Sequence, residues 1–214
     1  HYLEREWLSA LRACGFWMRL EMPRAGFYPR GGGEIQAQIR PVSEIQPLER
    51  VERGELRRIR GITAVANLSE EIARRQKLQA LRRLEPLCRD SKIETLVLPS
   101  IGKGTMLLLQ AEFEHATCCY FGLGAIGKRA EQVADEAVEG IEAFLSGPGA
   151  VDEYLADQII LPLAFARGTS RYRTARVSRH LLTNAAVIQA FLPIRVEIEG
   201  EEGQPGTVTI QIKP

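Results

Sequence analysis

The strongest constraint on the fold is the order in which two hydrophobic periodicities follow each other between residues 57 and 145. Four segments have the apolar, alternating character of β-strands: 57–66, 93–98, 106–113 and 118–123. Two segments have helical periodicity: 69–87 and 128–145. The first of these begins with Ser69, Glu70 and Glu71, which are typical of a helix start. The resulting order β-α-β-β-β-α predicts a compact α+β unit.

The segments on either side of this unit follow a different order. The chain opens on an amphipathic helix with one apolar side formed by Leu3, Trp7, Leu8 and Leu11. Two short alternating strands follow, 17–21 and 34–39, joined by a turn with the sequence GFYPRGGG. The last part predicts a helix over 150–166 with a kink at Pro162, a strand over 171–177, a helix over 180–191 and a hairpin formed by 194–198 and 207–212.

Composition excludes some classes of function. The 214 residues are 45% hydrophobic and 26% charged, typical of a globular protein, and 28 Lys and Arg balance 27 Asp and Glu. A near-neutral net charge argues against bulk, non-specific binding of nucleic acid. It does not exclude a small basic site that binds one end of an RNA. Four cysteines without a CxxC pair predict reduced thiols in a cytoplasmic protein. No apolar run is long enough to span a membrane, so no transmembrane helix is expected.

His180 is the most informative of the three histidines. If a helix begins near Ser178, His180 lies in its first turn, with Thr183 and Asn184 on the same face. The N–H groups and the positive dipole end of a helix start favour a phosphate, and a neutral imidazole can attack phosphorus. From periodicity alone, a histidine that only caps or decorates a helix start is the commoner case.

The preceding helix carries a second polar group. Tyr154, Asp157 and Gln158 fall at i, i+3 and i+4, so they are expected to share one face. A phenol ring, a carboxylate and an amide can together stack on and hydrogen-bond to a nucleotide. The alternative is a solvated polar face opposite Leu155 and Ile159, and the residues alone favour this alternative.

Three further patterns are less specific. Arg171, Arg173, Arg176 and Arg179 form a basic cluster that could contact phosphates or merely solubilise a strand edge. The three consecutive glycines of GFYPRGGG could let the backbone approach a ligand or form a tight turn. GKGT at 102–105 is not a P-loop, because glycine follows the lysine and the earlier glycine of that motif is replaced by Val97.

Four runs in this order, GFYPRGGGE, GKGTMLLL, EYLADQ and HLLTN, resemble the RNA 3′-terminal phosphate cyclase family. The resemblance covers essentially the whole chain, and its opening YLEREWL resembles a helix from the middle of family members. It therefore predicts a C-terminal portion without the N-terminal part. The implied fold is α+β: large-domain repeats of two helices on a four-stranded sheet, similar to the C-terminal domain of an initiation factor, with a smaller thioredoxin-like domain inserted. The predicted division is 1–53 (large domain), 54–147 (inserted domain) and 148–214 (C-terminal repeat).

The resemblance also implies a chemistry. In the family a histidine takes AMP from ATP, passes it to an RNA 3′-phosphate, and the neighbouring 2′-OH closes a 2′,3′-cyclic phosphate. His180 matches the nucleophile, and Tyr154, Asp157 and Gln158 match the adenylate pocket. ATP and RNA 3′-phosphate ends are the implied partners. Mg²⁺ is expected to offset the charge of the triphosphate, and the sequence does not place its ligands.

Two alternatives remain open at this stage. Cyclase-like proteins of ribosome biogenesis share the fold without the activity, but they lack the nucleophilic histidine, so His180 argues for the enzyme. The chain can also be an inactive fragment, in which exposed sheet edges could drive the formation of a homo-oligomer.

Overall fold

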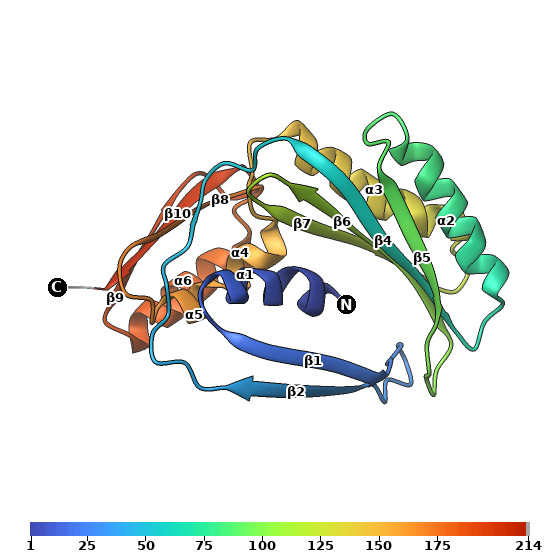
Figure 1. Cartoon of the computed structure of the whole chain (residues 1–214), viewed down its shortest axis with the longest axis horizontal. Coiled ribbons are helices and arrows are strands. Elements are labelled where there is room, and N and C mark those ends of the chain that lie inside the picture. The colour runs from blue at the N-terminus through green and yellow to red at the C-terminus, as the bar shows by residue number, and fades with distance from the viewer. Residues whose placement is uncertain (213–214) are drawn as a thin grey trace.

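The computed structural model describes residues 1–212, which form two four-stranded sheets, a two-stranded ribbon and the helices that cover them (Figure 1). The architecture is therefore α+β, as predicted. The two larger sheets lie at opposite sides of the molecule in the view of Figure 1, with the N-terminal helix between them.

The first four-stranded sheet has the strand order β5-β4-β6-β7. Its strands are β4 (Leu56–Ala66), β5 (Ser91–Val97), β6 (Gly104–Phe113) and β7 (Thr117–Leu123). The sheet is mixed, because β4 pairs in parallel with β5 while the other pairings are antiparallel. Helices α2 (Glu70–Leu84) and α3 (Ala130–Ser146) cover the same face (Figure 1). All six elements predicted between residues 57 and 145 are thus confirmed.

Local sequence explains why these helices form where they do. The Ser69 side chain caps α2 by accepting a hydrogen bond from the backbone N–H of Glu71 at 3.3 Å. The predicted apolar face of α3 is buried against the sheet and consists of Val133, Ala137, Ile141 and Phe144. The 3.6-residue period of α3 therefore determines which of its faces meets the strands.

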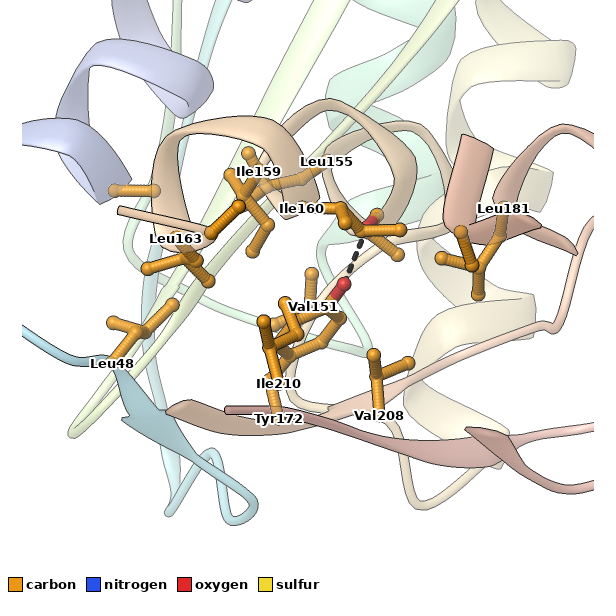
Figure 2. Packing of buried hydrophobic residues seen from close by; sticks show 14 of the residues in the cluster. Leu48, Val151, Leu155, Ile159, Ile160, Leu163, Tyr172, Leu181, Val208 and Ile210 are labelled. Atoms are coloured by element: carbon orange, nitrogen blue, oxygen red, sulfur yellow. Dashed lines mark hydrogen bonds between the residues drawn. The ribbon is translucent and has the colours of Figure 1, made fainter. Parts of the chain in front are cut away.

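The second four-stranded sheet has the order β3-β8-β10-β9. Its strands are β3 (Glu49–Arg50), β8 (Ser170–Thr174), β9 (Ile194–Glu199) and β10 (Gly206–Ile212). Helices α4 (Glu153–Gln158), α5 (Ile160–Leu163) and α6 (Arg179–Phe191) pack onto it. In Figure 2, Tyr172 of β8 lies in the middle of this core, and its hydroxyl donates to the carbonyl of Ala156 at 2.6 Å.

The N-terminal segment consists of η1 (Leu3–Trp7), a π-helical turn, then α1 (Leu8–Ala13), β1 (Trp17–Arg24) and β2 (Glu34–Arg40). Leu8 and Leu11 are buried as predicted, but Leu3 is 38% exposed and Glu6 is fully buried. A π-turn has more residues per turn than the 3.6 on which the prediction rested, so the inward face is shifted. The predicted apolar side is therefore wrong at Leu3.

Two predictions for the C-terminal part are corrected in detail. The helix expected over 150–166 is two short helices that meet at Ile159. Pro162 has no N–H to donate to the carbonyl four residues earlier, which lies at Gln158, so the helix breaks there rather than at the proline. The strand expected over 171–177 ends at Thr174. The short strand β3 was not predicted, because two residues carry no periodicity.

Each four-stranded sheet has a separate hydrophobic core. One core contains residues between Ile59 and Phe144 only; the other joins residues between Val151 and Ile210 with Ala10, Cys14 and Leu48.

The four cysteines are unpaired, as predicted. Within residues 1–212, no helix has the length and apolar character needed to cross a membrane.

Arg53 connects the two cores. Its guanidinium donates to the carbonyls of Phe144 and Leu145 at the end of α3, at 2.8 and 2.9 Å, and to the carbonyl of Gly149 at 3.0 Å. The same group lies 5.4 Å from the ring centroid of Phe113. The arginine thus satisfies carbonyls that the helix end leaves free and orients the chain as it passes to the second sheet.

Candidate functional site

His180 is the second residue of α6, at the position that the sequence predicts. Ser178 caps the helix, since its hydroxyl accepts a hydrogen bond from the N–H of Leu181 at 3.1 Å. Leu181 is buried in the core, whereas His180 is exposed. The imidazole therefore stands in solvent at the start of a 13-residue helix, where the positive end of the dipole favours a negatively charged ligand.

Asp157 lies close to His180. Burial raises the pKa of the Asp157 carboxyl, and the neighbouring His180 partly offsets this rise. The side-chain amide of Asn184, one turn along α6, donates to the backbone carbonyl of Asp157 at 3.5 Å. The C-terminal end of α4 and the start of α6 thus bring a carboxyl group and an imidazole together.

Gln158 is half-buried beside Asp157. Its side-chain oxygen is buried and has no hydrogen-bond partner among residues 1–212. A buried amide without a partner is costly, so such a group is a candidate for contact with the N–H of a ligand.

Tyr154 belongs to a cluster of aromatic side chains. Its ring packs against Phe121 of β7 at 5.6 Å between centroids, and against Tyr120 and Tyr2 at 6.2 and 6.0 Å. Tyr154, Asp157 and Gln158 all lie on α4 at the predicted i, i+3 and i+4 spacing, and Tyr154 in addition contacts aromatic side chains of β7 and of Tyr2.

Asp152 is the important residue that sequence reasoning missed. Its carboxylate is fully buried and accepts hydrogen bonds from the N–H groups of Tyr154 and Leu155 at 3.1 and 2.9 Å, which caps α4. It also accepts from the hydroxyl of Tyr2 at 2.6 Å and from the N–H of Cys119 at 3.2 Å. An aspartate directly before a helix is a capping signal that could have revealed this residue.

A second buried carboxyl lies near Asp152. Burial and the charge of Asp152 raise the pKa of Glu6, which accepts a hydrogen bond from the Thr117 hydroxyl at 2.9 Å. Burial also raises the pKa of Asp152, although the hydrogen bond from Tyr2 acts in the opposite direction. The junction of η1, β7 and α4 therefore contains two carboxyl groups that resist ionisation together.

The basic cluster is partly neutralised. Arg176 donates to Glu153 at 3.0 Å, and Arg179 lies 3.2 Å from Glu202. For Arg171 and Arg173, the described part of the chain provides no carboxylate within ion-pair distance. Only part of the predicted cluster is thus available for phosphate groups.

The part of the chain that the structure describes has no group of three or more His, Cys, Asp and Glu side chains arranged to hold a metal ion. The position of Mg²⁺, which the sequence left open, is therefore not assigned to any residue.

The comparisons with known proteins agree with one another. The family model described as RNA 3′-terminal phosphate cyclase matches residues 1–198. A protein of that name from Pseudomonas fluorescens is 42% identical over 196 residues, which cover 92% of this chain and 56% of the relative. Proteins of the same name from Ralstonia nicotianae and Methanopyrus kandleri are 39% and 38% identical; the alignments cover 99% of this chain and 60% of each relative. The chain thus spans less than two thirds of their length.

Proposed function

Since the chain belongs to the RNA 3′-terminal phosphate cyclase family, we propose that it carries the adenylation site of an enzyme that converts RNA 3′-phosphates into 2′,3′-cyclic phosphates at the expense of ATP. The observation that carries the proposal is the exposed imidazole of His180 at the start of α6, next to the carboxyl of Asp157. Because the chain spans only part of its relatives, the activity is proposed for the whole protein.

In the proposed first step, a neutral ring nitrogen of His180 attacks the α-phosphorus of ATP. A P–N bond forms, the bond to the β-phosphate oxygen breaks, and pyrophosphate leaves. The N–H groups and dipole of the helix start favour the negative charge that builds up around phosphorus. Asp157 lies near enough to His180 for their charges to interact, so its carboxylate would stabilise the positive charge of the imidazole after attack.

In the second and third steps the adenylate is transferred and displaced. An oxygen of the RNA 3′-phosphate attacks the same phosphorus, and His180 leaves. The neighbouring 2′-OH then attacks the RNA phosphate, loses its proton and expels AMP, which closes the cyclic phosphate. Each displacement is easier than a single direct cyclisation, which is the benefit of a covalent intermediate.

We assign the adenylate pocket to Tyr154, Asp157 and Gln158. The unpartnered amide oxygen of Gln158 supports this assignment, because a ligand N–H would satisfy it. Tyr154 is 38% exposed, so part of its ring remains free to contact a base. Bound Mg²⁺ would supply positive charge to the triphosphate.

The domain division follows the family. We propose that residues 54–147 are the inserted domain, and that 1–53 and 148–214 are parts of the large domain. The strand order β5-β4-β6-β7 with its own core supports the first assignment. The core that joins Ala10, Cys14 and Leu48 to the C-terminal sheet supports the second.

The test is transfer of label from ATP to the protein. The whole protein and Mg²⁺ are incubated with α-labelled ATP, and an acid-labile, alkali-stable adduct is expected; the 214-residue chain is treated in parallel. His180→Ala should abolish it, whereas His115→Ala, which removes another exposed histidine, should leave it unchanged. An adduct that survives His180→Ala contradicts the mechanism.

The same experiment distinguishes the proposed enzyme from two alternatives, an inactive fragment and a non-catalytic factor. An adduct formed by a full-length relative but not by these 214 residues would favour an inactive fragment. The absence of an adduct in both, together with retained RNA binding, would favour a non-catalytic RNA-binding factor of the same family.

A further inference from the structure

Two motifs that the adenylation site does not use meet at another place in the molecule. The turn GFYPRGGG joins β1 to β2, and GKGT ends the loop between β5 and β6. The N–H of Ala25 donates to the carbonyl of Pro99 at 2.8 Å, which holds the two loops side by side. Figure 1 shows both loops on the side of the molecule opposite to α6.

The glycines of these motifs allow the loops to pack closely. A Cβ atom on Gly104 would lie 2.1 Å from the ring of Phe27, and a Cβ on Gly32 would lie 2.8 Å from the side chain of Ile101. The side-chain amide of Asn67 donates to the carbonyls of Ser100 and Gly102, both at 2.8 Å. The loops are therefore fixed against each other before any ligand arrives.

Two adjoining hollows of about 600 and 610 Å³ lie at this junction. They share five lining residues: Phe27, Tyr28, Pro29, Lys103 and Ile126. The larger hollow extends between Met22, Met106 and Leu123. Their volumes fall in the range of small-molecule sites, and their walls suit a flat apolar group.

The rim of these hollows exposes large side chains. The Tyr28 ring is 96% exposed and Ile126 is fully exposed, while Ile101 and Leu123 are about half exposed. Exposed apolar side chains that surround one hollow are typical of a ligand-binding surface.

The charge at this rim is positive. Lys103 and Arg30 are both exposed, and no Asp or Glu lines either hollow. Neither cation has a carboxylate within ion-pair distance among residues 1–212, so both are available to a ligand. Unneutralised cations beside an apolar hollow fit a ligand that is both flat and anionic.

We propose that this junction binds a nucleotide of single-stranded RNA. The base stacks on Tyr28 and enters the apolar hollow, and Lys103 and Arg30 contact the flanking phosphates. Single-stranded RNA is commonly bound by an exposed aromatic ring next to cations. The choice of RNA as the ligand rests on the proposed function, to which this site adds a contact remote from His180.

The test measures binding of RNA directly. A decamer of uridines with a 5′-fluorescein and a 3′-phosphate is titrated with the 214-residue chain and followed by anisotropy. Tyr28→Ala should weaken binding about tenfold, because it removes the stacking platform. Tyr28→Phe should bind within about twofold of the parent, since the ring is retained. Phe191→Ala, an exposed aromatic on α6, is the matched control and should not change binding.

Salt dependence tests the cations. Lys103→Gln should weaken binding and lower the slope of log K against log salt by about 0.7, the value for one lost phosphate contact to a single strand. Lys92→Gln removes an exposed lysine on β5, outside the hollows, and should leave the slope unchanged.

The proposal is overturned if the parent does not bind the decamer, or if Tyr28→Ala binds as tightly as Tyr28→Phe. Labelling of His180 by ATP is measured on the same variants and should be unaffected by them. Loss of RNA binding in Tyr28→Ala, with no His180 adduct in either the parent chain or the whole protein, would support this site and contradict the adenylation proposal. The reverse result would contradict this site alone.

Discussion

The two ends of helix α4 differ sharply in how they are held. At the N-terminal end, Asp152 is fully buried and accepts four hydrogen bonds from three different segments. At the C-terminal end, the side-chain oxygen of Gln158 has no partner among residues 1–212, and the Asn184–Asp157 hydrogen bond is 3.5 Å long. One end therefore contributes stability, and the other leaves polar groups available for a ligand. Because α4 is anchored at its N-terminal end, the polar groups at its C-terminal end can be held in place without forming hydrogen bonds within the protein.

The largest effect is expected from Asp152→Ala. The substitution leaves the N–H of Cys119 and the N–H groups at the start of α4 without an acceptor. The free energy of unfolding should therefore fall by about 4 kcal/mol. Urea unfolding followed by circular dichroism measures the change. Asp157→Ala at the other end of α4 is the control and should cost less than about 1 kcal/mol. Equal losses for the two variants would contradict the comparison.

The second prediction concerns pH. Burial raises the pKa of Glu6 from 4.5 to about 8, so the folded state binds more protons than the unfolded state between these values. Stability should consequently be greatest at the lower end of this window and fall by a few kcal/mol as pH rises through it.

Glu6→Gln should flatten this dependence, because the amide cannot ionise. Urea midpoints measured at several pH values would reveal the difference between parent and variant. A parent whose stability rises with pH across the window, or a variant with an unchanged slope, would show that Glu6 is ionised in the folded protein.

The third prediction tests the link between the N-terminal helix and α4. Tyr2→Phe removes a hydroxyl that donates to Asp152 at 2.6 Å but keeps the ring in the aromatic cluster. The expected loss is about 1.5–3 kcal/mol, the range for a hydrogen bond to a charged group. Tyr28→Phe, at an almost fully exposed ring, is the matched control and should not change the midpoint.

The difference between the two ends also explains what the sequence could predict. The order of strands and helices between residues 57 and 145 was predicted correctly, because the apolar period of each segment is local information. The burial of Glu6 was not, because it depends on Thr117 and Arg50, which are distant in sequence. The aromatic neighbours of Tyr154 were not predicted for a similar reason, since Tyr120 and Phe121 come from β7, which is distant in sequence.

The open end was easier to predict because it depends on local signals. Ser178 before the helix and the apolar spacing of Leu181 and Ala185 place the exposed His180 at the helix start. The capping role of Asp152 was equally visible as a local signal, but its contacts with Tyr2 and Cys119 were not. Support that joins distant segments is therefore the part that sequence patterns leave out.

The smallest effect on stability is expected from His180→Ala, although its effect on labelling by ATP should be complete. The side chain is exposed and makes no hydrogen bond with residues 1–212. The free energy of unfolding, measured with urea, should therefore change by less than about 0.5 kcal/mol. Removing the imidazole removes the proposed nucleophile, so labelling should disappear. A large loss of stability would show that His180, which lies on α6 near the C-terminal end of α4, supports the fold, and that end of α4 would then not differ from the other in the way proposed here.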